Sequence, residues 1–200
     1  MSSNSYKLIL VVSDLSNSEI PSHVKEMFST AKLNYVICLG NVGNKNNVNY
    51  LKSLSNNFYI VYGDKDDFDD NLKEVETLKI DSFTIGIING FQVVPWRDLY
   101  SLSSIRSKFN CDILLHGFTG IQSFQTLNGK HYLNPGSLSG NANRINTSIT
   151  PGFMVLLIDN DYGVCYKYEL KENSKKVNIL KSEFKKLPDE EDNNKNVEED

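Results

Sequence analysis

The chain has few cysteines and no long apolar run, and each shortage excludes a class of protein. Its three cysteines, Cys38, Cys111 and Cys165, are odd in number and far apart, which predicts reduced, buried thiols rather than a disulfide framework. No stretch approaches the roughly eighteen apolar residues that a membrane helix needs. The start, MSSNSYK, lacks the basic and then apolar layout of a signal peptide. We therefore expect a cytosolic protein with no direct membrane insertion.

Net charge is small outside the C-terminal end. The formal charge is −4, and residues 188–200 carry seven acids against one lysine, which leaves the rest near +2. Such a body has no basic footprint for nucleic acid. The acidic end has too few apolar residues to order itself. We predict a flexible N-terminus over 1–5, one domain over 6–187 and a disordered acidic tail over 188–200.

Strand and helix patterns alternate in the first half, and hairpins dominate the second. The first half predicts strands at 6–13, 35–40 and 58–63, separated by helices at 18–31 and 44–55. The second half predicts a strand at 82–90, a helix at 96–109, a strand at 111–117, hairpins at 123–134 and 152–170, and a last strand at 175–184. Asn128-Gly129 is typical of a type I′ turn. These patterns indicate an α/β domain with two packed sheets and helices outside.

Glycines or short polar residues stand just after five consecutive strands. The motifs are SDLS at 13–16, GN at 40–41, GDKD at 63–66, NGF at 89–91 and GFTG at 117–120. Ligands of open α/β sheets bind beyond the carboxyl ends of the strands, so a site is expected there. Taken alone, Asp14 and Asp64 are better explained as plain helix caps or turn residues than as ligands.

The order of these motifs resembles the calcineurin-like metallophosphoesterases. Within that family it is most similar to the small phosphoesterase-like subunits of retromer, through GN, GD, NGFQVVPWRDLYSL at 89–102, NPGS at 134–137 and the Tyr166-x-Tyr168 pair. The resemblance covers about residues 6–187. It implies a four-layer α/β/β/α sandwich of two mixed sheets flanked by helices.

The resemblance also implies that the two-metal site of the family is vestigial here. Residues other than histidine occupy the family's histidine positions, and Asn41 stands where catalytic members place a bridging carboxylate. The positions of the vestigial site are Asp14, Ser16, Asn41, Asp64, Asn89, Phe118 and Gly120.

Two carboxylates and two amides are poor ligands for zinc, which prefers imidazole or thiolate. We expect no catalytic residue and no cofactor, or at most one loosely held Mg²⁺ or Ca²⁺ ion. His116 is one residue out of register with a ligand position, so its side chain is expected to face away as a satisfied strand histidine. The remaining acids Asp67, Asp69 and Asp70 are expected to form a solvated loop.

Two apolar surfaces are candidates for protein partners. The loop at 91–96 is unusually apolar, and by the resemblance Phe91, Val94, Trp96 and Phe118 bind the large α-solenoid subunit, with Val93 facing inward. The alternative is that Val93 and Trp96 both turn into the core. The resemblance implies a second pocket, for regulators with Pro- or Leu-bearing loops, at Leu8, Val155, Tyr166 and Tyr168.

The expected function is that of a non-catalytic scaffold subunit of retromer. It is expected to bind the C-terminal α-solenoid of the large subunit, as a monomer within a hetero-oligomer. The complex is expected on the cytosolic side of endosomes, in transport to the Golgi and plasma membrane. Two alternatives stay open: a weak single-metal phosphoesterase that uses Asp14, Asn41 and Asp64, and a stand-alone protein-binding module.

Overall fold

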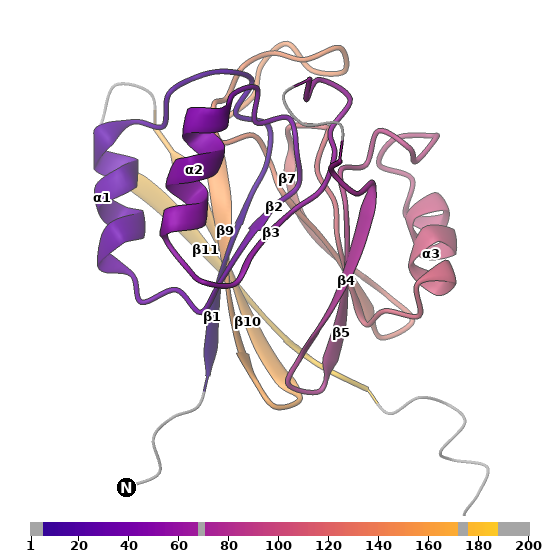
Figure 1. Ribbon diagram of the computed structural model, residues 1–200. Helices are drawn as coiled ribbons and strands as arrows, with labels where there is room; N and C mark the ends of the chain where they lie inside the picture. The colour runs from indigo at the N-terminus through magenta and orange to yellow at the C-terminus, as the bar shows by residue number, and fades with distance from the viewer. Residues whose placement is uncertain (1–5, 68–70, 172–175, 188–200) are drawn as a thin grey trace, which may run out of the picture.

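The computed structural model describes residues 6–67, 71–171 and 176–187, which fold into four layers (Figure 1). A six-stranded and a five-stranded sheet pack face to face. Helices α1 (Ser22–Thr30) and α2 (Lys45–Ser53) cover the first sheet, and α3 (Leu99–Lys108) covers the second. The predicted α/β/β/α sandwich is confirmed. The predictions for 1–5, for 188–200 and for Asp69 and Asp70 lie outside the described residues.

The six-stranded sheet has the order β11-β10-β9-β1-β2-β3. Its parallel strands are β1 (Lys7–Val12), β2 (Tyr35–Cys38) and β3 (Phe58–Ile60), joined through α1 and α2. Its antiparallel strands are β9 (Gly152–Asp159), β10 (Tyr162–Leu170) and β11 (Val177–Lys185). The near-continuous aliphatic run of β1 is explained because one face of this strand meets the second sheet and the other meets the helices.

The five-stranded sheet has the order β4-β5-β6-β8-β7. Its strands are β4 (Val75–Ile80), β5 (Phe83–Ile88), β6 (Ile113–Leu115), β7 (Gln122–Leu127) and β8 (Lys130–Pro135). Asn128 and Gly129 both have positive φ, at 50° and 70°, as the predicted β7–β8 turn requires. The sequence patterns did not predict β4, a half-polar strand at the edge of its sheet.

Two helices begin later than predicted. α1 begins at Ser22 rather than at 18, with Pro21 at its N-cap. Proline disfavours helical backbone in the residue before it, so the segment from 18 to 20 stays outside the helix. α3 begins at Leu99 rather than at 96, because the Asp98 side chain accepts a hydrogen bond from the Ser101 N–H at 2.7 Å and caps the helix there.

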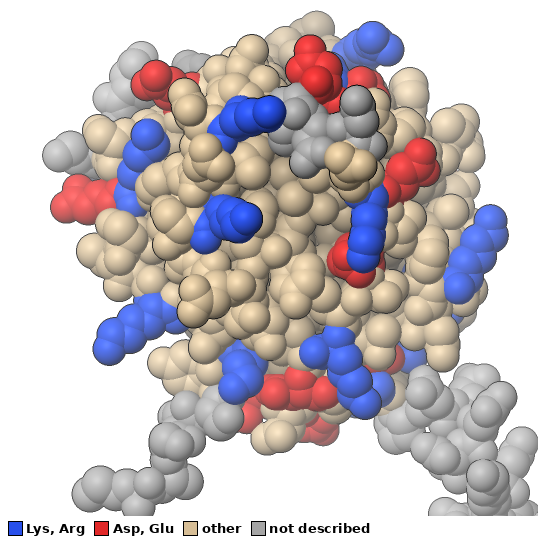
Figure 2. All heavy atoms as spheres, viewed as in Figure 1, with Lys and Arg blue, Asp and Glu red and all other residues tan. Residues whose placement is uncertain are grey.

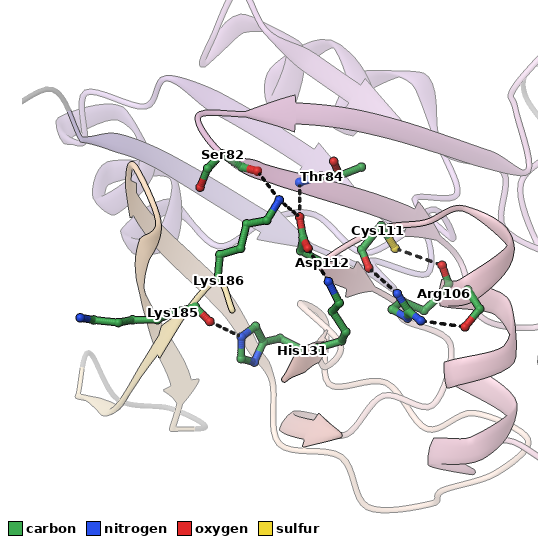
Figure 3. A network of polar contacts seen from close by, with 10 residues as sticks. Ser82, Thr84, Arg106, Cys111, Asp112, His131, Lys185 and Lys186 are labelled. Carbon is green, nitrogen blue, oxygen red and sulfur yellow. Dashed lines mark hydrogen bonds and ion pairs between the residues drawn. The ribbon is translucent and has the colours of Figure 1, made fainter. Parts of the chain in front are cut away.

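A charge cluster around the buried Asp112, just before β6, joins the two sheets (Figure 3). Asp112 accepts from Lys130 Nζ at 2.8 Å and from Lys186 Nζ at 2.9 Å, and the Thr84 N–H adds a third hydrogen bond. His131 contacts Thr126 Oγ1 and the Lys185 carbonyl. His131 is therefore a structural residue, and its ring bonds β11 to the five-stranded sheet.

The three cysteines are free and buried, as predicted, and burial raises the pKa of each thiol. Within the described part of the chain, no helix is long and apolar enough to cross a bilayer. Figure 2 shows basic and acidic side chains interspersed on the face in view, with no large area of one sign.

Candidate functional site

The carboxyl ends of β1, β2 and β3 meet at one end of the sandwich, at the top in Figure 1. The loops after these strands bring Asp14, Asn41 and Asp64 together. Asp14 and Asn41 have left-handed backbone, with φ of 53° and 57°. Asp and Asn adopt that conformation more readily than most residues, which explains their use at these sharp turns.

Asn41 is the centre of this cluster. Its Nδ2 donates to Asp14 Oδ1 at 2.9 Å and to Asp64 Oδ1 at 3.2 Å, while its Oδ1 accepts from the Lys65 N–H at 3.1 Å. The amide therefore presents N–H groups to the carboxylates, where a bridging ligand would present oxygen atoms to metal ions. As folded, the cluster is closed by its own hydrogen bonds.

Asp14 is held in place and largely removed from water. Its main-chain carbonyl accepts hydrogen bonds from Ser137 Oγ at 2.8 Å and Ser139 Oγ at 2.9 Å. Burial raises the pKa of the Asp14 carboxyl to about 6, although the hydrogen bond from Asn41 and the nearby Lys65 charge act in the opposite direction. This carboxylate is therefore costly to keep charged in the folded state.

Asp66 holds two of the site loops together. Its carboxylate accepts from the N–H groups of Asn41 at 2.7 Å, Val42 at 2.8 Å, Gly43 at 3.2 Å and Gly63 at 3.1 Å. Burial raises the pKa of Asp66, and these four donors oppose the rise. The sequence places Asp66 after the third strand, but no local pattern indicates this role.

The cavity at the cluster has a volume of about 10 Å³, which is room for about one water molecule. Five of the seven predicted positions line it. The other five lining residues were not predicted: they are Lys65 and four residues of the 141–145 loop, one of which is the cation Arg144. The lining is Asp14, Ser16, Asn41, Asp64, Lys65, Phe118, Asn141, Asn143, Arg144 and Ile145. Lys65 and Arg144 balance the two carboxylates.

Two predicted positions do not line this cavity. Asn89 is fully buried and donates to the Leu39 carbonyl, and Gly120 packs near Ile149 and Asn143. His116 is also absent from the lining, as its register predicted. The prediction that His116 is fully satisfied is wrong: its Nε2 is buried and has no hydrogen-bond partner among the described residues.

The loop at 91–96 presents one valine to the core and the next to solvent. Val93 is 4% exposed and packs with the cluster under α3, whereas Val94 is 72% exposed. Trp96 is 43% exposed, and its ring centroid lies 5.3 Å from that of Phe118. The predicted orientation of the two valines is confirmed, and the alternative that Trp96 turns into the core is wrong.

The four residues of the predicted regulator pocket lie on the outer face of the six-stranded sheet, and all are half-buried. Val155 is paired with Tyr166 across β9 and β10, and Leu8 is paired with Leu157. Tyr168 stacks on Phe153 with ring centroids 4.6 Å apart.

Residues 8–161 match the family model of the calcineurin-like phosphoesterase superfamily domain. The chain therefore belongs to the calcineurin-like phosphoesterase superfamily and has its fold. Relatives that match nearly the whole chain allow a more specific family assignment. They show that the chain belongs to the Vps29 family. Membership of this family indicates a retromer subunit in vacuolar protein sorting, and so one chain of a hetero-oligomeric complex.

Three relatives illustrate the similarity. Vacuolar protein sorting 29 from Cryptosporidium parvum is 35% identical, with a TM-score of 0.85 and coverage of 90% of this chain and 99% of that one. Wild-type Vps29 from Entamoeba histolytica, solved with Zn²⁺, is 31% identical, with a TM-score of 0.83 and coverage of 88% and 99%. Vacuolar protein sorting-associated protein 29 of Schizosaccharomyces pombe is 27% identical over 90% of this chain and 98% of its own length.

The donor atoms at this site do not fit a zinc ion or a pair of divalent ions. Zinc sites rely on imidazole or thiolate, and the described lining contains neither. Within the described ranges, no three or more His, Cys, Asp and Glu side chains gather as a metal-binding group. The N–H groups of Asn41 also point at the two carboxylates that a cation would need.

Asp14→Asn is expected to stabilise the protein at pH 7. Because the folded-state pKa is raised to about 6, the stability that Asp14 contributes is present below about pH 4 and is lost as the pH rises to about 6. Removing the charge should raise the free energy of unfolding by up to about 3 kcal/mol at pH 7. Urea unfolding measures this gain, which should shrink towards zero near pH 4. A less stable variant at pH 7 would contradict this account of Asp14.

Proposed function

We propose that this chain is a non-catalytic scaffold subunit of retromer. The face around the former metal site docks onto the C-terminal α-solenoid of the large subunit. The observation that carries this proposal is Val94, which is 72% exposed beside the Trp96–Phe118 ring pair. The complex acts at endosomes, on the cytosolic side, in transport to the Golgi and plasma membrane.

The exposed loop has the properties of an interface centre. Stable interfaces place apolar and aromatic residues at their core, and a few such anchors supply most of the binding energy. Val93 anchors the loop from below, and Phe91 lies edge-on to Tyr62 at 6.0 Å between ring centroids. Contacts of this kind hold a loop in one conformation, and a loop held in its bound conformation pays less entropy on association.

Co-purification tests the proposal against a stand-alone binding module. The tagged chain is isolated from native lysate of its own organism under mild salt, and bound proteins are quantified by mass spectrometry. We expect the large retromer subunit in near-equal amount. Recovery of the chain with no large subunit would favour the stand-alone module.

The proposal of a non-catalytic subunit rests on Asn41. Two bound metal ions would need an oxygen bridge at this position, and the amide donates hydrogen bonds to Asp14 and Asp64 instead. Purified protein is expected to contain no stoichiometric transition metal and to hydrolyse no general phosphoester substrate. Elemental analysis and a hydrolysis assay measure both. One tightly bound Zn²⁺ or Mn²⁺ ion per chain, with hydrolysis abolished by Asp64→Ala, would support the phosphoesterase alternative.

The second part of the proposal is that regulators with Pro- or Leu-bearing loops bind at Leu8, Val155, Tyr166 and Tyr168. These residues present half-buried apolar and aromatic surface outside the six-stranded sheet. Val155→Glu should weaken peptide ligands of this pocket by several kcal/mol, because the contact desolvates the new charge. Binding is measured by titration calorimetry. Retained solenoid binding is the control, and global unfolding of the variant would mean that Val155 belongs to the core.

A further inference from the structure

Strand β11 is a free edge of the six-stranded sheet, and within the described part of the chain it pairs with β10 alone. Its nine residues pair without a bulge, from Val177 opposite Leu170 to Lys185 opposite Tyr162. The other edge strands are shorter, since β3 has three residues and β4 and β7 have six each. A long edge with unpaired backbone groups is a template for another strand.

The alternation of an antiparallel pair shows which backbone groups of β11 face away from β10. The Lys186 N–H donates to the Asp161 carbonyl, so the hydrogen-bonded pairs with β10 contain the even-numbered residues of β11. The N–H and C=O groups of the odd-numbered residues therefore point outward. Near the end of the strand, the outward carbonyl of Lys185 is bonded to His131 Nε2 at 3.2 Å, so the five-stranded sheet covers the edge there. Over residues 177–183, the open stretch, the outward groups have no hydrogen-bond partner among the described residues.

The open stretch also exposes two adjacent apolar side chains. Ile179 is 50% exposed and Leu180 is 43% exposed, and as neighbours in a strand they lie on opposite faces of the sheet. Strand edges of soluble proteins are commonly blunted by proline, by a bulge or by charged side chains. The open stretch contains no proline and no bulge, and its only two charged residues, Lys181 and Glu183, form an ion pair with each other. This edge is therefore poorly protected against strand addition.

We propose that two copies of this chain associate through β11, antiparallel about a two-fold axis, so that their six-stranded sheets form one continuous sheet. Leu180 is the centre of the open stretch, and an axis at this residue uses the whole stretch. In that register Leu180 meets Leu180 of the second copy, Ile179 lies opposite Lys181, and Val177 lies opposite Glu183. The outward N–H and C=O groups of the odd-numbered residues then bond to each other in four hydrogen-bonded pairs.

Charge favours a second copy as the occupant of this edge. The lysine and the glutamate of the open stretch neutralise each other within one chain, so two copies do not repel. An axis at Leu180 also keeps like charges from directly opposed positions, whereas an axis at Lys181 would set that lysine against itself. β11 contributes no residue to the cavity at the vestigial site or to the loop at 91–96, so each copy stays free to bind its own large subunit. The proposal is therefore independent of solenoid binding.

Cysteine cross-linking tests the register, because the three native cysteines are buried. In Leu180→Cys, the two new thiols face each other in a non-hydrogen-bonded pair, with Cα atoms about 4.5 Å apart and within disulfide range. We expect oxidation with diamide to give a covalent dimer that reduction reverses. Ser182→Cys is the matched control on the same face. Its two thiols would be four residues apart along the paired strands, about 13 Å, and should not cross-link. Cross-linking of Ser182→Cys but not of Leu180→Cys would overturn this register.

Sedimentation equilibrium of the full chain tests the backbone pairing. Lys181→Pro removes one outward N–H and no hydrogen bond to β10, so the variant should fold, as thermal unfolding would verify. By symmetry the dimer loses two hydrogen bonds, and we expect its dissociation constant to rise at least about tenfold. Lys181→Ala keeps the N–H and should dimerise like the unchanged chain. Equal loss in both variants would overturn pairing through the backbone. An unchanged chain that stays monomeric at its highest soluble concentration would overturn the proposal and leave the edge to an extended peptide of another protein.

Discussion

Val94→Asp is expected to abolish binding to the C-terminal solenoid of the large retromer subunit, while the fold stays intact. The side chain is 72% exposed, so the substitution should change the free energy of unfolding of the free chain by less than about 0.5 kcal/mol. In the complex, the new carboxylate would be desolvated against an apolar centre. Loss of a central anchor costs on the order of 2–4 kcal/mol, before the penalty for the buried charge is added. Calorimetry with the purified solenoid and thermal unfolding of the free chain measure both effects.

Val93→Asp is the matched variant, one residue away with the opposite orientation. Val93 is 4% exposed and packs under α3 with Leu102 and Tyr132. A carboxylate there has no partner among the described residues that pack in this cluster, so it should cost several kcal/mol and unfold much of the protein. Normal solenoid binding by Val94→Asp would place the docking face elsewhere on the molecule.

Asp66→Ala is expected to have the largest effect on stability of any single acidic substitution near the site. The carboxylate satisfies four backbone N–H groups from two loops, and each buried donor left without a partner costs about 1–3 kcal/mol. Water can reach some of these N–H groups in the variant, so we expect the free energy of unfolding to fall by about 4 kcal/mol. Denaturant unfolding at pH 7 measures this loss.

Asp67→Ala is the control for that experiment. Asp67 is the adjacent residue and is exposed, so its removal should change stability by less than about 0.5 kcal/mol. Equal effects of the two substitutions would contradict the role assigned to Asp66. If folded Asp66→Ala protein still binds the solenoid, Asp66 supports the site loops but does not belong to the docking surface.

Much of the fold was predictable because local patterns agree with the tertiary structure. The aliphatic run of β1 indicated a strand buried on both faces, and Asn128-Gly129 indicated the β7–β8 turn. The edge strand β4 was missed, since its alternation is half polar and weak. Helix starts were misplaced where a cap such as Asp98 overrides the apolar periodicity.

The candidate site was only partly predictable for a different reason. Asp14, Asn41 and Asp64 follow strands, so topology alone brings them together. Lys65 and Arg144 reach the cavity from loops far apart in sequence, and no local pattern indicates that meeting. Asp66 stands among four other acids, and only the fold separates this buried anchor from its solvated neighbour Asp67.

Hydrogen–deuterium exchange on the complex tests where the solenoid contacts this chain. The chain is mixed with the purified C-terminal solenoid of the large subunit, and backbone protection is compared with that of the free chain. The account predicts new protection at residues 91–97 and 117–120, around Val94, Trp96 and Phe118, with little change on β9 and β10. Protection confined to β9 and β10, or no protection at saturating solenoid, would contradict docking through the former metal-site face.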